Sequence, residues 1–243
     1  MLAPMPLPVT SLLPVTLPIA TPAPMPVTSP WPLHRVAGAR FSQRCFSLLA
    51  LPREAWKNQG GWTRTVASAQ GADGQTDWRV SVADITAAGP FSVFEGLDRQ
   101  AVMLQGARLR LRAEAPEPPN PPEPDIHFNG AGSRAAFAGE RRLVCDAPTE
   151  PTALWNVMHR RGRVRAEVSV HNDTVLHLPP ARHLFIYVMS GEVELALPHC
   201  RTQGLSAGQG LHLQHTPAQA LLAPCRVGSW VVVTAIAEEK NPL

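Results

Sequence analysis

Short segments in which apolar and polar residues alternate dominate the chain from about Phe41 onward. The clearest examples lie at 78–83, 107–112 and 164–170. A period of two places successive side chains on opposite faces of a half-buried strand. The runs 184–189 and 230–234 are instead almost continuously apolar, which is typical of strands buried on both faces. Because helical signals are sparse and turn residues separate the runs, we expect an all-β sandwich or barrel.

Two proline-rich segments interrupt this pattern. Ten of the 26 prolines precede Leu33, so we expect residues 1–40 to be disordered and to have no part in the main activity. The second segment, 114–134, is dense in proline and glutamate, and proline cannot enter a central strand. We expect it to be an exposed loop or a lid within a single domain at 41–237, joining halves at about 41–113 and 135–237.

The composition limits the compartment and the partners. Four cysteines without a Cys-x-x-Cys pair favour reduced thiols over a zinc knuckle or a disulfide framework. No apolar run approaches the ~20 residues of a membrane helix. Residues 1–33 also lack the positive charges that open a secretory signal. The net charge of +3 is spread along the chain. We therefore expect a cytoplasmic protein that binds neither membrane nor nucleic acid.

A first cluster of polar residues surrounds a glycine pair at 56–64. Glycine lets the backbone turn sharply and approach a ligand closely, and the side chains here differ in their hydrogen-bonding roles. The candidates for ligand binding are Lys57, Asn58, Gly60, Gly61, Thr63 and Arg64. If a strand begins at Trp62, an inward Thr63 implies an outward Arg64. The alternative is a surface turn with a capping Asn58 and an exposed arginine.

Two later clusters, at 78–99 and 154–161, add further candidates. On the strand expected at 78–83, Arg79 and Ser81 share one face while Trp78 lies on the other. The candidates for ligand binding in these clusters are Ser81, Phe91, Ser92, Arg99, Asn156 and Met158. A buried asparagine needs partners for its amide, either as a structural clip or as a ligand contact. The alternative is structural: the phenylalanines would pack turns against the core, and the arginines would lie on a solvent-exposed strand edge.

Taken in order, these clusters resemble the HutD/Ves family. Its sequences carry Trp-Lys/Arg-Asn-Gly-Gly-Gly-x-Thr-Arg, then Trp-Arg-x-Ser-x-Ala, then Gly-Pro-Phe-Ser-x-Phe-x-Gly-x-x-Arg, and then Asp-x-Asn-x-Met with trailing arginines. The corresponding segments are 56–64, 78–83, 89–99 and 154–161, and the resemblance covers roughly 44–237. Gln59 departs from the family pattern at a usual glycine, and Leu154 at a usual acidic residue.

The resemblance implies a bicupin, a double-stranded β-helix barrel with few short helices. It also implies an association with histidine utilisation. Members of the family are thought to modulate that pathway, through binding of an acidic intermediate such as urocanate or formylglutamate. No established catalytic activity comes with the family.

Many cupins hold a metal through two histidines spaced by one residue, a glutamate and a third histidine, so the histidines need attention. A His-x-His pair is absent from this sequence. His183 stands alone before its strand, and His212 and His215 are three residues apart, which places them on opposite faces of a strand. Motifs for a nucleophile or for phosphate binding are missing too. We therefore expect no metal and no cofactor.

The sequence favours a ligand-binding accessory or regulatory protein whose partner is a small polar or acidic metabolite, with a homodimer left open. The alternative is a metal-independent cupin enzyme acting on a small carboxylated metabolite, with Lys57 or Asp84 as acid or base. A third hypothesis is nucleic-acid binding through the arginines at 160–165. The small number of aromatic residues weighs against that hypothesis.

Overall fold

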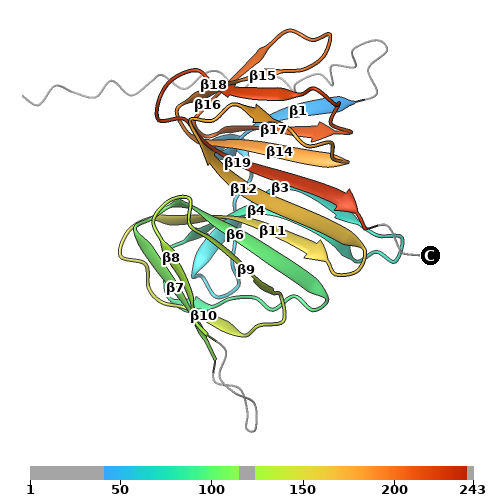
Figure 1. The fold of residues 1–243 in the computed structure, drawn as a ribbon. Helices are drawn as coiled ribbons and strands as arrows, with labels where there is room; N and C mark the ends of the chain where they lie inside the picture. The colour runs from blue at the N-terminus through green and yellow to red at the C-terminus, as the bar shows by residue number, and fades with distance from the viewer. Residues whose placement is uncertain (1–40, 115–123, 240–243) are drawn as a thin grey trace, which may run out of the picture. The chain divides into compact units, whose positions relative to one another are not determined.

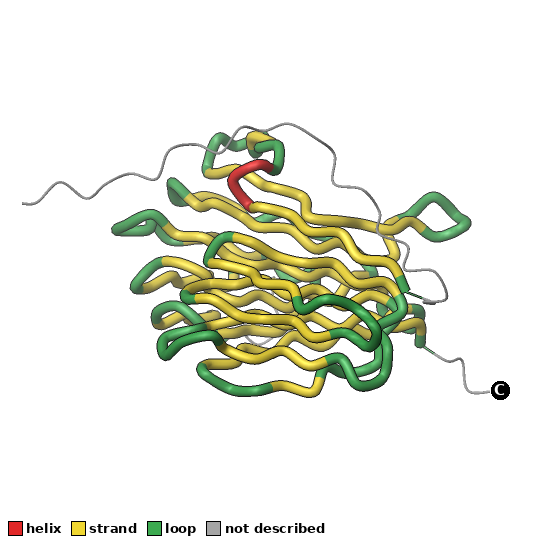
Figure 2. Tube along the Cα trace, turned by 90° about the horizontal axis from the view of Figure 1, so that it is seen from above, coloured by secondary structure: helices red, strands yellow, loops and turns green. Residues whose placement is uncertain are grey.

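The computed structural model describes residues 41–114 and 124–239. The expectation for residues 1–40 therefore lies outside the described residues, as does the one for most of the proline-rich run after Glu114. The described chain consists almost entirely of antiparallel strands with one short 3₁₀ helix, η1 (Leu48–Ala50), coloured red in Figure 2. The prediction of an all-β fold with few short helices is confirmed.

Two large sheets lie at the centre of the fold. The six-stranded sheet has the order β2 (Glu54–Ala55), β3 (Gly61–Gln70), β4 (Thr76–Ile85), β11 (Thr152–Arg160), β6 (Leu97–Gln105) and β9 (Arg134–Ala138). The five-stranded sheet has the order β1 (Ser42–Ser47), β17 (Gln209–Gln214), β14 (His183–Ser190), β19 (Trp230–Glu238) and β12 (Val164–Asn172).

A smaller sheet covers the outer face of each large one, so that the described residues form two sandwiches (Figure 1). In the first sandwich, the small sheet has the order β5 (Gly89–Pro90), β10 (Leu143–Cys145), β7 (Arg108–Ala113) and β8 (Ile126–Asn129). In the second, it has the order β13 (Leu176–His177), β18 (Leu221–Pro224), β15 (Glu192–Ala196) and β16 (Gln203–Ser206).

The alternating sequence pattern gives each large sheet two apolar faces and therefore three cores. One core, with Met103 and Phe128, fills the first sandwich. A second, with Ile186 and Leu211, fills the second sandwich. The third core contains Trp155 and lies between the two large sheets. Neighbouring residues of a strand thus belong to different cores, as a period of two requires.

The two sandwiches divide the chain at a different place from the predicted halves. β1 pairs with β17 and so belongs to the second sandwich, while β11 pairs with β4 and β6 in the first. Apart from β1, the described chain passes from the first sandwich to the second between β11 and β12. Part of that segment, β8, is a strand that pairs with β7 and buries Phe128. The surrounding prolines hide this short alternation in the sequence, and strand pairing between distant residues leaves no local sequence signal.

In the described part of the chain, no helix is long and apolar enough to cross a membrane.

Candidate functional site

The inner face of the first sandwich carries polar side chains at the centre of the six-stranded sheet. On β4, Trp78 and Val80 enter the core between the large sheets, while Arg79 and Ser81 point the other way, into the first sandwich. The alternation of residues 78–83 predicts this division, because it assigns Arg79 and Ser81 to one face. Strand pairing brings Asn156 of β11 beside Ser81.

Two arginines flank Met158 in a row that crosses three strands. Met158 of β11 lies opposite Arg79 of β4 on one side and opposite Arg99 of β6 on the other. Both arginines line a small cavity of about 60 Å³ inside the first sandwich. The full lining is Trp56, Thr63, Arg79, Ser81, Ala83, Phe91, Ser92, Phe94, Arg99, Asn156 and Met158. We call this cavity the Arg99 pocket.

Arg99 is a buried cation with weak partners. Its side chain is 5% exposed, and it donates to the Ser92 carbonyl at 3.3 Å and to Asn156 Oδ1 at 3.4 Å. The Nε atom is buried without a hydrogen-bond partner. Burial, and next the charge of Arg79, lower the pKa of Arg99 to about 10. Arg99 is therefore still protonated at neutral pH, although its surroundings penalise the charge.

Aromatic rings surround the Arg99 guanidinium. Its central carbon lies 5.5 Å from the ring centroid of Phe91, 5.4 Å from that of Phe94 and 5.0 Å from that of Phe137. Cation–π contacts of this kind hold the cation in place and keep water away from it, but they do not neutralise it.

Arg79 adds a second positive charge to the pocket. Its Nη2 donates to Thr65 Oγ1 at 3.2 Å, and its Nε is buried without a hydrogen-bond partner. Among the described residues, neither Arg79 nor Arg99 forms a salt bridge, although ion pairs are common elsewhere on the chain. Leu154 packs in the apolar core beside the pocket, so the inward face of β11 presents no carboxylate to either arginine.

The structure brings seven of the twelve predicted site residues together in the pocket: Thr63, Ser81, Phe91, Ser92, Arg99, Asn156 and Met158. Arg64 points away from Thr63, as the strand pattern requires, and pairs with Asp84 at 3.2 Å outside the pocket. Lys57 is exposed and is not part of the lining. Neither residue considered as an acid or base, Lys57 or Asp84, therefore reaches the pocket.

The loop residues Asn58, Gly60 and Gly61 lie behind the pocket and position its wall. Asn58 Nδ2 donates to the Pro90 carbonyl at 3.1 Å, and its Oδ1 accepts from the Gly60 amide at 3.1 Å. A Cβ on Gly61 would collide with the Asp84 carbonyl. These contacts hold Trp56, whose Nε1 donates to Thr63 Oγ1 at 2.8 Å.

Sequence reasoning missed four of the lining residues: Trp56, Arg79, Ala83 and Phe94. The shared strand face of Arg79, Ala83 and Ser81 was the available signal for two of them. Trp56 and Phe94 reach the pocket through loops, for which the period of a strand gives no direction.

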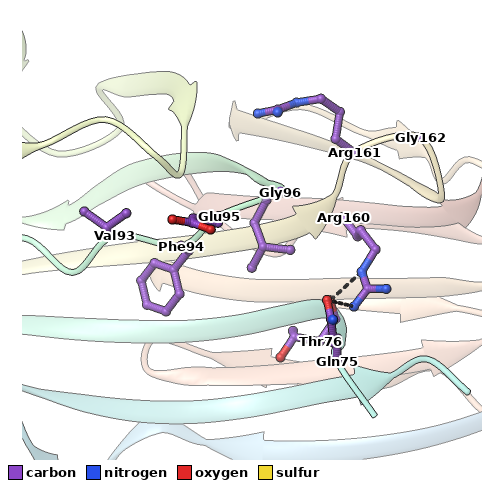
Figure 3. A pocket seen from close by; sticks show the side chains of 10 residues that line it. Gln75, Thr76, Val93, Phe94, Glu95, Gly96, Arg160, Arg161 and Gly162 are labelled. Carbon is purple, nitrogen blue, oxygen red and sulfur yellow. Dashed lines mark hydrogen bonds between the residues drawn. The ribbon is translucent and has the colours of Figure 1, made fainter. Parts of the chain in front are cut away.

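The arginines that follow Met158 lie elsewhere and are neutralised. Arg160 pairs with Asp73 at 2.6 Å, and Arg161 pairs with Asp98 at 2.6 Å and with Glu140 at 3.1 Å. They line a larger surface pocket of about 680 Å³, where Arg160 also bonds to Gln75 and Thr76 (Figure 3). Because carboxylates already pair with both arginines, this pocket has little uncompensated positive charge to attract an anion.

The histidines do not form a metal cage in the part of the chain that the structure describes, where no group of three or more metal-ligating side chains occurs. His183 is nevertheless not isolated, because its Nδ1 lies 3.1 Å from Nε2 of His212. This pair, which joins β14 to β17, left no signal in the local sequence.

The fold and the Arg99 pocket define a class: an all-β, cupin-like protein with a small, positively charged cavity in one sandwich. Within that class, the chain belongs to the HutD family, whose model matches residues 49–229.

A curated relative agrees with this family assignment, and solved structures share the fold. A 21.2 kDa protein in the hutC 3′ region of Pseudomonas putida is 30% identical over 165 residues, covering 67% of this chain and 82% of that protein. HutD from Pseudomonas fluorescens SBW25 has a similar fold, with a TM-score of 0.67, 21% identity and coverage of 82% of this chain and 100% of that one. A single-site variant of oxalate decarboxylase from Bacillus subtilis shares the fold more distantly, with a TM-score of 0.52, 10% identity and coverage of 80% and 77%.

Proposed function

We propose that the chain is a small-molecule-binding accessory protein of histidine utilisation, and that the Arg99 pocket receives the anionic head group of its ligand. The observation that carries the proposal is the buried guanidinium of Arg99, which has no carboxylate partner among the described residues.

A buried charge without a counter-ion destabilises a fold by several kcal/mol unless other groups compensate it. Arg79 increases this cost, because two like charges face one cavity. A ligand carboxylate would supply the missing charge, and guanidinium groups match its geometry. Ser81, Thr63 and Asn156 add hydroxyl and amide groups that fix its orientation.

The size of the cavity limits what enters it. A volume of about 60 Å³ has room for a group of formate or carboxylate size, since a water molecule occupies ≈ 30 Å³ in the liquid. The rest of a larger ligand would have to lie outside this small cavity. Carboxylated and formylated intermediates such as urocanate and formylglutamate fit this requirement.

The relatives give the proposal its metabolic setting. The Pseudomonas putida relative carries the name of the hutC 3′ region, and the Pseudomonas fluorescens HutD structure is designated a formate condition. We therefore assign the ligand to histidine utilisation, and the role to modulation of that pathway.

The lining of the pocket supports binding rather than acid–base catalysis. None of the described residues that line it is an aspartate, glutamate, histidine, cysteine or lysine. General acid–base chemistry near neutral pH uses such groups. The metal-independent enzyme considered above thus has no candidate acid or base at the pocket.

Calorimetry tests the proposal with formate, formylglutamate and urocanate as probes. We expect Arg99→Met to weaken binding roughly 10- to 100-fold, because a charge-assisted hydrogen bond is lost. Arg79→Met should weaken it less, since Arg79 lies nearer to solvent. Arg64→Met is the matched control, because Arg64 pairs with Asp84 outside the pocket. Equal affinities for wild type and Arg99→Met would refute the proposal.

The proposal extends to the compartment and the assembly. The cysteines of the described chain, Cys45, Cys145, Cys200 and Cys225, are all free thiols, which suits a reducing cytoplasm. Cell fractionation tests this location. The homodimer stays a prediction, and light scattering on the protein as it elutes from a size-exclusion column would test it.

A further inference from the structure

A second polar cavity lies between the two large sheets, on the opposite side of β4 from the Arg99 pocket. It has a volume of about 490 Å³ and is lined by β1, β3, β4, β14 and β17. Its polar lining includes Ser42, Arg44, Ser68, His183, His212 and Gln214. Trp78 forms part of it, whereas the next residue, Arg79, lines the Arg99 pocket. The two cavities are therefore separate sites. We call this one the histidine-pair pocket.

Two uncharged imidazoles form one wall of the histidine-pair pocket. His212 is 7% exposed, and its ring stacks on Phe185 with a centroid distance of 4.1 Å. Burial, then the charges of His183 and Arg44, lower the pKa of His212 to about 3. Burial is also the largest cause for His183, whose pKa falls to about 4. Both rings are therefore neutral at pH 7 and carry one N–H each.

The neutral pair offers a ligand both a donor and an acceptor. One N–H is used between His183 Nδ1 and His212 Nε2, at 3.1 Å. If His183 donates, its own Nε2 is an acceptor and His212 Nδ1 is a donor; if His212 donates, these roles are exchanged. No other hydrogen bond from the described residues reaches either ring. The pair can thus match a group of either polarity by exchanging tautomers.

Arg44 brings an unneutralised positive charge to the same pocket. Its Nη2 donates to the Val66 carbonyl at 2.7 Å, which fixes the side chain between β1 and β3. Among the described residues it forms no salt bridge, so most of its donors remain available to a ligand. Strand pairing places Arg44 of β1 directly opposite His212 of β17, next to the imidazole wall.

We propose that the histidine-pair pocket is a second ligand site for a small carboxylate that also carries an amide or hydroxyl group. The carboxylate pairs with Arg44, and the second group bonds to the outer nitrogens of His183 and His212. The volume lies within the ≈ 300–1,000 Å³ of small-molecule sites. It is far larger than the Arg99 pocket, so an entire small metabolite fits.

The imidazole NMR signals of His183 and His212 at pH 7 provide the test, with N-acetylglycine as probe. We expect saturable shifts of these two histidines. N-acetylglycinamide, which lacks the charge, and propionate, which lacks the amide, should bind about tenfold more weakly or worse. If concentrations up to about 10 mM N-acetylglycine leave both histidine signals unmoved, the site does not exist.

Three variants separate this site from other causes. Arg44→Gln should weaken N-acetylglycine binding about tenfold, because the charge that pairs with the carboxylate is lost. Arg44 is exposed, so the variant should fold, and a thermal melt verifies this. Arg226→Gln is a matched control, an exposed arginine paired with Glu192 away from the pocket. Arg99→Met should retain the histidine shifts, which distinguishes the two sites. Equal binding by Arg44→Gln and wild type would overturn the proposal.

Discussion

The two sandwiches share an architecture but differ in what they bury. In the second, the buried residues with which the five-stranded sheet packs against the small sheet are apolar, as in Leu184, Ile186, Leu211 and Val233. In the first, the six-stranded sheet places Arg99 and Asn156 at the equivalent depth. Buried polar groups destabilise a fold unless they have hydrogen-bond partners. Their presence in one sandwich therefore points to a function rather than to stability. We infer that the interior of the second sandwich supports the fold, whereas the interior of the first sandwich is kept polar for the ligand proposed at the Arg99 pocket.

The largest expected effect is on the stability of the second sandwich. Leu211→Ala would leave a cavity at a fully buried side chain, and such changes cost about 2–5 kcal/mol of unfolding free energy. Urea denaturation measures this loss, with Leu49→Ala as control, since Leu49 is 86% exposed. The folded protein should keep its affinity for formate. A large loss of affinity would mean that the second sandwich also shapes the Arg99 pocket.

Arg99→Met should affect stability in the opposite way. Its removal takes away a buried charge that lacks a counter-ion, so unfolding free energy should stay equal or rise by about 1 kcal/mol, although the cation–π contacts are lost. The same variant loses carboxylate binding. Urea denaturation of the ligand-free protein provides the measurement. A destabilisation as large as that of Leu211→Ala would indicate that Arg99 is retained for structure and would erase the contrast between the sandwiches.

The contact between the sandwiches should respond to acid. His183 and His212 have an unfolded pKa near 6.5, lowered in the folded state to about 4 and about 3. The unfolded chain therefore binds more protons between these values, so the stability that the neutral pair contributes is complete above pH 6.5 and declines as pH falls toward 4.

Urea denaturation at pH 7 and at pH 5 measures this decline. His212→Phe should reduce the difference between the two pH values, because one of the two titrating groups is gone and a ring still stacks on Phe185. His177→Phe is the control, since His177 lies on β13, away from the pair. An unchanged pH dependence in His212→Phe would show that other groups cause it.

How far the sequence predicts this molecule depends on whether the signal is local. Alternation at 78–83 is a local signal, and it correctly separates Trp78 from Arg79 and Ser81. Partnerships between distant strands are not local, which is why the sequence revealed neither the pairing of β1 with β17 nor the meeting of His183 with His212. Whether the residues gathered at the Arg99 pocket bind a ligand stays a prediction.

The glycine pair illustrates an intermediate case. Gly60 and Gly61 correctly indicate a close approach of the backbone, but glycine does not reveal what comes close. We expected a ligand; the structure places Asn58 against Gly60, and the Asp84 carbonyl and the Trp56 ring against Gly61. Gly60 and Gly61 therefore support the pocket wall without lining the cavity, and a substitution at Gly61 would displace Trp56.

The smallest expected effect concerns this same loop. Gln59 adopts φ 57°, in the left-handed region, within a turn closed by its amide on the Trp56 carbonyl at 3.0 Å. A side chain there costs roughly 1–2 kcal/mol, whereas glycine loses about 0.5–1 kcal/mol through its freedom in the unfolded chain. Gln59→Gly should therefore stabilise the protein by at most about 1 kcal/mol, as a small rise in Tm. Gln59→Ala, which keeps a Cβ, should give no rise. If both variants have the same Tm, backbone strain at Gln59 does not lower the stability of the protein. The loop then accepts glutamine in place of the family's glycine without loss of stability.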